Sequence, residues 1–325
     1  MAAATTTTQP PPHVIEECSS VRLLSDGSII RDPDPEFPPS IHDDGSIEWK
    51  DLPFGPPHLS LHLRLYRPKL LCSSSSSAKL PVVFYFHGGG YCFGSRTWSI
   101  FHDCGLRLAS SLSAFVISPD YRLAPEHRLP AAIHDGAAAL DWLHSDPDPW
   151  LAQSADLSRV FVSGESAGAN LAHHLALRSA RTDPDRIRIK GFILLMPFFA
   201  GVDRTKSESE CPSDAFLPLD RSDQYWRLAL PLGATRDDPL ANPFSLGGSE
   251  LESAALGPLM VVVGERDMLR DRGVEYGRRL KEMGKSVEMV ELKGKEHGFF
   301  AMNSWSEDAG DLVRLIGRFM DEHHK

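Results

Sequence analysis

Short apolar runs alternate with longer amphipathic segments over most of this 325-residue chain, and this alternation constrains the fold more than any other feature. The run Leu80–Phe86 is nearly continuous in apolar residues, which is typical of a strand buried on both faces of a sheet. Strands that alternate with helices form a mainly parallel sheet with helices on both faces, so the class is α/β. The expected strands are 59–66, 80–86, 114–118, 160–163, 189–196, 259–263 and 287–292, and the expected helices are 101–112, 131–144, 167–180, 221–230, 269–283 and 312–323.

Four segments depart from this alternation. Residues 1–12 are rich in Ala, Thr and Pro and are expected to be disordered, and the serine run Ser73–Ser77 predicts a flexible loop. Residues 13–50 mix short apolar pieces with Pro, Asp and Ser, which predicts an irregular arm. Residues 197–258 form a long insertion, and insertions at the carboxyl edge of a parallel sheet are often lids. The sequence therefore predicts one domain over residues 1–325, with a cap made from the arm and the insertion.

Composition excludes some classes of partner. The formal net charge of −10 argues against nucleic acid or an anionic membrane as the main partner. The apolar stretches are too short to span a bilayer, and the first residues lack the basic and apolar pattern of a secretory signal, so we expect a cytoplasmic protein, with the nucleus as a second candidate compartment. The oligomeric state stays open, a homodimer included. Free thiols in a reducing compartment are expected, because no zinc or redox spacing relates the five cysteines, Cys18, Cys72, Cys92, Cys104 and Cys211.

The pentapeptide Gly164–Gly168 reads Gly-Glu-Ser-Ala-Gly and lies between the expected strand 160–163 and the helix that follows it. In that setting a Gly-x-Ser-x-Gly motif is a nucleophile elbow, a sharp turn that exposes a serine hydroxyl at the start of a helix. Glycines at both ends let the strand and the helix approach closely. The pattern predicts Ser166 as a nucleophile.

Three glycines follow His87 directly after the expected strand 80–86. Acyl transfer passes through a tetrahedral oxyanion, which preorganised N–H groups must hold, and glycine lets the backbone turn those groups inward. We expect the N–H groups of Gly88 and Gly89 as donors, with the Ala167 N–H as the third. A plain glycine turn is the alternative, and the elbow farther along the chain favours the oxyanion loop.

A serine hydroxyl needs a general base, and the chain order around such an elbow is serine, acid, histidine. His297 is the candidate that lies in a loop after the expected strand 287–292. The remaining histidines after the serine lie on the helix that follows it or at the end of the chain; they are His173, His174, His323 and His324.

The acid is expected in the loop after the strand 259–263. Asp267 is placed there to orient the imidazole and to stabilise its cation. Glu265 lies early, at the strand end, and Asp271 falls inside the next expected helix, where an ion pair with a neighbouring cation is the simpler expectation. The predicted acid is therefore Asp267.

Ser166, Asp267 and His297 together predict ester hydrolysis through an acyl-enzyme. The substrate would be a small-molecule ester or lactone. The mechanism needs no metal ion and no cofactor.

Three motifs carry a resemblance to a known family: His87–Tyr91 (His-Gly-Gly-Gly-Tyr), Asp120–His127 and Gly164–Gly168. Together they resemble the hormone-sensitive-lipase-like branch of the α/β-hydrolases, from about Val14 to the end of the chain. The arrangement is similar to the plant carboxylesterases, which include gibberellin receptors that lack the catalytic histidine. The presence of His297 therefore favours a working hydrolase over a receptor.

Within the plant set, the resemblance is closest to the strigolactone-hydrolysing carboxylesterases. It implies a catabolic enzyme that opens the butenolide ring ester of strigolactone hormones, with a general xenobiotic esterase or a hormone receptor without turnover as the alternatives. The segments that carry it are 93–96, 197–201, 225–228, 231–237 and 242–244.

Two further interpretations concern residues outside the expected triad. The polar loop Asp120–His127 is expected to support the elbow rather than to take part in the chemistry. Aromatic residues in or beside the insertion could line an apolar pocket or form a small core of the insertion itself; these are Phe198, Phe199, Phe216, Tyr225 and Trp226.

Overall fold

A computed structural model describes residues 11–18, 20–32, 42–69, 79–145, 148–181 and 188–324. The predicted disorder of residues 1–10 and the predicted loop at Ser73–Ser77 lie outside the described residues. The chain divides into two compact units, Met1–Glu36 and Phe37–Lys325.

The first unit contains a small antiparallel sheet in the order β1-β2-β3. Its strands are β1 (Val14–Cys18), β2 (Val21–Leu24) and β3 (Ile29–Arg31). The prediction of an irregular arm over residues 13–50 is therefore wrong for these strands, and also for residues 47–50, which begin a strand of the second unit. The strands escaped prediction because they are only three to five residues long and mostly exposed or half-buried, so they carry no apolar alternation. That the arm acts as a lid stays a prediction.

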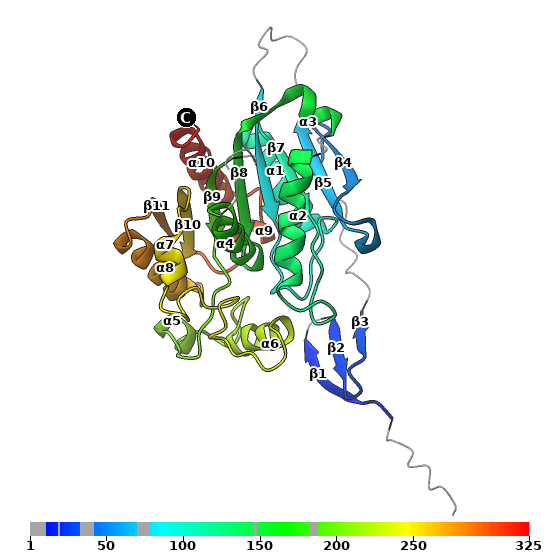
Figure 1. Cartoon of the computed structure of the whole chain (residues 1–325), viewed down its shortest axis with the longest axis vertical. Helices are drawn as coiled ribbons and strands as arrows, with labels where there is room; N and C mark the ends of the chain where they lie inside the picture. The colour runs from blue at the N-terminus through cyan, green and yellow to red at the C-terminus, as the bar shows by residue number, and fades with distance from the viewer. Residues whose placement is uncertain are drawn as a thin grey trace, which may run out of the picture. The chain divides into compact units, whose positions relative to one another are not determined.

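The second unit is built on an eight-stranded sheet in the order β11-β10-β9-β8-β6-β7-β5-β4 (Figure 1). The strands from β11 to β7 in this order run parallel, and β5 pairs antiparallel with both β7 and β4. The α/β prediction of a mainly parallel sheet is confirmed. The strands are β4 (Ile47–Pro53), β5 (His62–Pro68), β6 (Leu80–Phe86), β7 (Phe115–Pro119), β8 (Ala155–Glu165), β9 (Ile189–Leu195), β10 (Leu259–Gly264) and β11 (Val287–Leu292).

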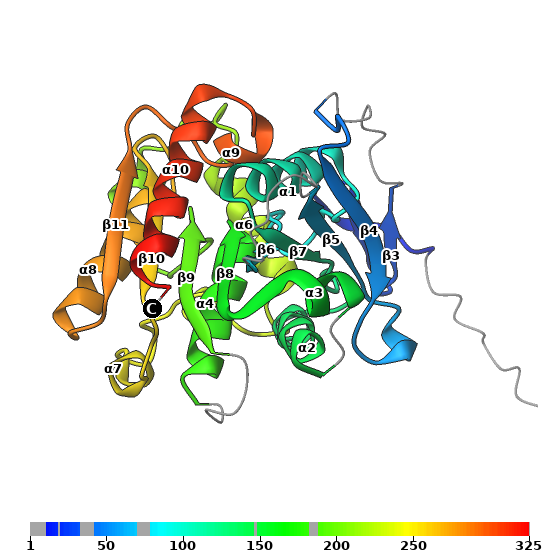
Figure 2. The same ribbon diagram turned by 90° about the horizontal axis from the view of Figure 1, so that it is seen from above.

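Helices cover both faces of this sheet. Helix α1 packs against α10 on one face and α2 packs against α4 on the other, while α8 packs against β10 and β11 (Figure 2). No helix in the described ranges is both long and apolar enough to cross a membrane. The helices are α1 (Ser99–Leu112), α2 (Ala131–Ser145), α3 (Pro149–Ser154), α4 (Ala167–Ser179), α5 (Lys206–Ser209), α6 (Leu219–Ala229), α7 (Ser249–Ser253), α8 (Arg270–Glu282), α9 (Phe299–Met302) and α10 (Glu307–Glu322).

The strand expected at 59–66 is displaced in the structure. A 3-10 helix occupies Pro57–Leu59, and β5 begins at His62. The strict alternation also predicted a half-buried strand, but the polar position Arg64 is buried. Its guanidinium pairs with Asp51 at 2.8 Å and lies over the Trp49 ring, 4.1 Å from the ring centroid. A buried charge is tolerated when it is paired in this way.

The insertion at 197–258 contains three helices, α5, α6 and α7, where the sequence predicted α6 alone. The four cysteines in the described part of the chain form no disulfide, and Cys211 is the one of them that is only partly buried. In the sheet β6 and β8 are neighbours and β9 separates β8 from β10 (Figures 1 and 2). These strands run parallel, so the loops that follow them lie along the same edge of the sheet.

Candidate active site

Ser166 lies in a sharp turn between β8 and α4. Its backbone has φ 55° and ψ −115°, a strained conformation for a residue with a side chain. The turn requires glycine at Gly164, because a Cβ there would overlap the carbonyl oxygen of Gly168. The strand, the turn and the helix form the elbow that the sequence predicts.

The structure brings the three predicted side chains together in one hydrogen-bonded chain. His297 Nε2 lies 2.9 Å from Ser166 Oγ, and His297 Nδ1 lies 2.9 Å from Asp267 Oδ2. Ser166 and His297 are each 7% exposed and Asp267 is 2% exposed. Water is therefore largely excluded from both hydrogen bonds, which strengthens the electrostatic interaction within them.

A backbone N–H group holds the Asp267 carboxylate in place. Its second oxygen, Oδ1, accepts a hydrogen bond of 2.9 Å from the Leu269 backbone N–H, just before α8 begins. The two rival acids are engaged elsewhere. Glu265 accepts from the Gly294 N–H at 2.8 Å, and Asp271 pairs with Arg270 at 3.0 Å.

The other histidines of the described chain do not reach Ser166. His173 Nδ1 lies 2.9 Å from the Tyr276 hydroxyl, and His174 Nε2 lies 3.2 Å from the Leu240 carbonyl. His323 and His324 follow the end of α10. The geometry agrees with the choice of His297 by chain order.

Two opposing effects set the basicity of His297. Burial lowers its pKa, whereas the charge of Asp267, the hydrogen bond to Asp267 and the charge of Glu165 raise it. The raising effects prevail, so the pKa of His297 is above its ordinary value. The site thus favours an imidazolium, which is the form a general base takes after it has accepted a proton.

Gly88 and Gly89 face the same cavity as Ser166. Gly89 has φ +113°, and a Cβ there would overlap the Phe93 carbonyl oxygen, so the position requires glycine. His87, which precedes Gly88, is fully buried, and its ring nitrogen Nδ1 lies 2.7 Å from the Gly88 carbonyl oxygen. Ala167, which carries the third expected donor, is the first residue of α4. Its N–H therefore belongs to the first turn of that helix, where backbone donors have no partner within the helix.

The loop Asp120–His127, which the sequence predicted to support the elbow, contacts the glycine loop through Tyr121. The Tyr121 hydroxyl donates to the His87 carbonyl at 2.8 Å, and its ring stacks on the His87 ring at 4.4 Å between centroids. The Asp120 carboxylate accepts from the Arg96 backbone N–H at 2.7 Å. These contacts fix the loop from outside the cavity.

A cavity of about 100 Å³ lies beside Ser166. Its rim includes two exposed apolar side chains, Phe216 at 52% and Met302 at 53% exposure. Among the lysines and arginines of the described chain, Arg221 is the one that lines this cavity. The remaining side chains of the wall are mostly apolar, among them Phe93, Ile100, Phe101, Phe198, Leu217 and Tyr225.

The aromatic residues of the insertion divide between the two alternatives that the sequence left open. Phe198, Phe216 and Tyr225 line the cavity. Trp226 instead stacks on Phe198 at 4.4 Å between ring centroids, and Phe199 packs against a tyrosine of α8. The insertion thus contributes to the wall and also forms a small core.

Sequence reasoning missed the other half of this wall. Phe93, Ile100 and Phe101 come from the segment between β6 and the first turn of α1, and Met302 comes from α9. No motif marks them, because their position depends on how α1 and α9 pack at the end of the sheet. Their closeness in sequence to the glycine loop and to His297 is the one signal that could have indicated them.

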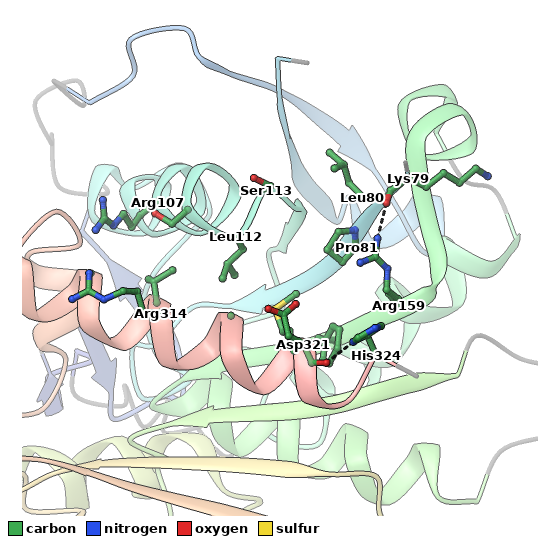
Figure 3. Close-up of a pocket in the computed structure, with 16 residues that line it drawn as sticks. Lys79, Leu80, Pro81, Arg107, Leu112, Ser113, Arg159, Arg314, Asp321 and His324 are labelled. Atoms are coloured by element: carbon green, nitrogen blue, oxygen red, sulfur yellow. Dashed lines mark hydrogen bonds between the residues drawn. The ribbon is translucent and has the colours of Figure 1, made fainter. Parts of the chain in front are cut away.

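A larger cavity of about 460 Å³ lies elsewhere, between α1 and α10 (Figure 3). Arg107 and Arg314 lie toward one end of it, and Arg159 and His324 toward the other. Neither Ser166 nor His297 lines it. Volume alone therefore does not identify the site, and the smaller cavity is the candidate because it contains an aligned nucleophile and base.

Comparisons with known proteins agree with this geometry. A family model for the alpha/beta hydrolase fold matches residues 83–301. The chain belongs to the alpha/beta-hydrolase family. This alpha/beta hydrolase is similar to Carboxylesterase 20 of Arabidopsis thaliana, with 40% identity over 294 residues that cover 84% of the chain and 86% of the relative.

Two further proteins to which this alpha/beta hydrolase is similar are esterases. The 3-O-acetylpapaveroxine carboxylesterase CXE1 of Papaver somniferum is 38% identical over 260 residues, covering 77% of this chain and 81% of the relative. The solved structure of an esterase from Pyrobaculum calidifontis superposes with a TM-score of 0.72 at 30% identity, covering 85% of each chain. The protein is a serine carboxylesterase of the plant carboxylesterase type, and thus a carboxylic ester hydrolase.

Proposed function

We propose that this carboxylesterase hydrolyses a small apolar ester or lactone through an acyl-enzyme on Ser166. The observation that carries the proposal is the buried chain of two 2.9 Å contacts that joins Ser166 to His297 and His297 to Asp267. Each side chain then has one role: Ser166 attacks, His297 moves the proton, and Asp267 orients the imidazole.

In the first half of the reaction, His297 Nε2 takes the proton from Ser166 Oγ as that oxygen attacks the ester carbonyl. The imidazolium then gives this proton to the departing alkoxide, and the acyl group stays on Ser166. In the second half, His297 takes a proton from water as the resulting hydroxide attacks the acyl-enzyme. The bond to Ser166 Oγ then breaks, the imidazolium returns its proton to that oxygen, and the acid product leaves. Asp267 keeps its negative charge throughout.

The tetrahedral intermediate carries a negative oxygen that needs donors. We assign the N–H groups of Gly88, Gly89 and Ala167 to this role. Support comes from the position of the two glycines on the cavity wall and from the start of α4 directly after Ser166. The N-terminus of a helix also favours negative charge. Each such donor is typically worth about 3–4 kcal/mol in the transition state.

The size and polarity of the cavity support a small apolar acyl group or ring. A volume of about 100 Å³ is well below the range of roughly 300–1,000 Å³ that is usual for drug-sized ligands. A ring as small as a butenolide is compatible with it, and the rest of a larger molecule would then extend past Phe216 and Met302. We propose strigolactone catabolism in a plant as the specific function, with the cytoplasm as the leading compartment.

Hydrolysis of p-nitrophenyl acetate tests the catalytic proposal. We expect turnover by the wild-type chain and loss of at least a thousandfold in the Ser166→Ala variant. Absence of wild-type turnover would favour a hormone receptor that uses the pocket without chemistry. Undiminished turnover by Ser166→Ala would remove the serine from the mechanism.

A separate experiment tests the substrate. Incubation with a strigolactone analogue, followed by mass spectrometry, should reveal the free butenolide or a covalent adduct on Ser166. If the analogue stays intact while p-nitrophenyl acetate is hydrolysed, the hormone assignment is wrong and a general xenobiotic esterase becomes the better description.

A further inference from the structure

A second carboxylate, Glu165, is buried beside the proposed triad. It precedes Ser166 in the chain, is 2% exposed, and contributes to the wall of the same cavity. Burial of a charged group is costly unless other groups compensate it. The mechanism above assigns Glu165 no role, so its burial calls for an explanation.

The groups that face Glu165 come from four different segments. The Tyr85 hydroxyl on β6 donates to Glu165 Oε2 at 3.0 Å. The Cys104 thiol on α1 interacts with Tyr85 and lies 3.3 Å from the Ser304 hydroxyl oxygen. His297 and Asp267 act on the carboxylate through their charges.

The other carboxylate oxygen is less well satisfied. Glu165 Oε1 has no side-chain hydrogen-bond partner within the described ranges, although the backbone N–H of Ala301 approaches the carboxylate. His297 lines the same cavity as Glu165, and among the charged groups that shift the pKa of Glu165 its effect is the largest. The protonated form of His297 is therefore a cation placed to compensate the charge of Glu165.

The electrostatic effects on the two residues are mutual. Burial raises the pKa of Glu165, and the charge of His297 together with the Tyr85 hydrogen bond opposes that rise. In the other direction, the charge of Glu165 helps to raise the pKa of His297. The carboxylate is thus most readily ionised when His297 is an imidazolium, which is the state that forms during acyl transfer.

We propose that Glu165 is a positioning residue that supplies a second negative charge to the His297 imidazolium, beside the charge of Asp267. The inference rests on the proposed function of the triad. No proton passes to Glu165: the Ser166 proton moves to His297 and then to the leaving group, and Glu165 stabilises the intermediate charge. The Tyr85 hydrogen bond holds the carboxylate in place.

A purely structural role predicts a different behaviour. Glutamine has nearly the same shape as glutamate and can still accept a hydrogen bond from the Tyr85 hydroxyl, so a structural role would leave catalysis unchanged in Glu165→Gln.

The charge of Glu165 also affects stability. A carboxyl whose pKa is raised by folding contributes stability below its unfolded pKa and loses that contribution as the pH rises through the folded pKa. Removal of the Glu165 charge should therefore raise the melting temperature at pH 8 more than at pH 5.

The direct test is a nuclear magnetic resonance titration of the His297 imidazole in the wild-type chain and in Glu165→Gln. It is combined with melting temperatures and with pH profiles of p-nitrophenyl acetate hydrolysis. Glu165→Asp keeps the charge on a shorter side chain and should retain part of the activity. Glu208→Gln is the matched control, because Glu208 is also buried, at 3% exposure, but pairs with Arg272 instead.

We expect the imidazole of Glu165→Gln to titrate at a lower pH than in the wild type, and kcat to fall by about tenfold. Glu208→Gln should lose thermal stability and keep the titration of His297. An unchanged His297 titration in a folded Glu165→Gln variant would overturn the inference. Because the titration needs no turnover, a shift without wild-type hydrolysis would retain the inference about charge and reject the proposed function instead.

Discussion

Replacement of Asp267 by asparagine tests the assignment of the acid with little change of shape. The asparagine oxygen can take the place of Oδ1 and accept the 2.9 Å hydrogen bond from the Leu269 N–H. The fold at the start of α8 should therefore persist. What disappears is the negative charge next to His297 Nδ1, and the amide nitrogen can also favour the wrong tautomer of the imidazole.

The structure gives the size of the expected effect. Asp267 Oδ2 and His297 Nδ1 are 2.9 Å apart, and both residues are almost completely buried. Coulomb's law with an effective dielectric constant of about 20 gives about 6 kcal/mol for opposite unit charges at this distance. Since about 1.4 kcal/mol corresponds to a tenfold change in rate, kcat should fall by up to about four orders of magnitude.

Initial rates of p-nitrophenyl acetate hydrolysis measure this loss, and circular dichroism checks that the variant is folded. Asp271→Asn is the control, because Asp271 is the rival acid in the same segment and pairs with Arg270. We expect it to stay within about threefold of the wild type. A folded Asp267→Asn variant with more than a tenth of the wild-type kcat, or an equal loss in Asp271→Asn, would refute the reasoning.

Three further predictions concern the oxyanion loop, the pH dependence and the cavity rim. Gly89→Ala should lower kcat by about a hundredfold to a thousandfold, because its Cβ would overlap the Phe93 carbonyl oxygen and move an N–H donor; Gly233→Ala, at a positive φ with open space around it, should leave kcat unchanged. The kcat/KM profile should lose half its maximum at a pH above 6.5 as the pH is lowered, because the base must be neutral and the pKa of His297 is raised; a midpoint below 6.5 would contradict this. Met302→Ala should raise the rate ratio of p-nitrophenyl hexanoate to p-nitrophenyl acetate by several-fold with a stability change within about 0.5 kcal/mol, because the side chain is half-exposed at the rim; an unchanged ratio would show that the rim does not limit acyl length.

The sequence predicted the central strands well because their burial leaves little ambiguity. Leu80–Phe86 was predicted to the residue, since the run is apolar almost throughout and ends at the glycine loop. By contrast, 160–163 was too short for β8, which begins at Ala155. The first residues of that strand are polar, and side-chain hydrogen bonds such as Arg159 to Asp156 at 2.8 Å hold them in place. Such local polar contacts leave no apolar pattern.

The short helices of the insertion were missed for a related reason. Helix α5 has four residues, too few for a periodic pattern. Its capping box, in which Thr205 and Glu208 satisfy each other's backbone N–H groups, was nevertheless readable as Thr-x-x-Glu. The small sheet also carried a readable signal, because Asp26-Gly27 between the apolar residues of β2 and β3 is a typical hairpin turn.

The predicted triad and the cavity wall, of which the sequence indicated only the part from the insertion, differ in what positions them. Ser166, Asp267 and His297 follow strands of the parallel sheet, so chain order and strand ends were enough to select three side chains that lie together in the structure. The wall comes from the insertion, from the start of α1 and from α9, and these segments meet only through tertiary packing. A sequence therefore carries more information about the reaction than about the substrate.

Substitutions in the strands that hold the triad and substitutions at the rim of the cavity should differ in their cost to stability. The strands β6, β8 and β10 are buried where they approach the site, so a substitution that moves them costs core packing, whereas β11, which precedes the His297 loop, is half-buried. The exposed rim residues Phe216 and Met302 make few such contacts, and changes there alter the shape of the cavity at little cost in stability. Differences in substrate among alpha/beta hydrolases of this type should therefore lie mainly in the insertion and around α9, while the geometry of the serine, the histidine and the acid is retained. Glu165 is the exception within the wall, because it lines the cavity and also belongs to β8. A change there would alter the chemistry and the pocket together.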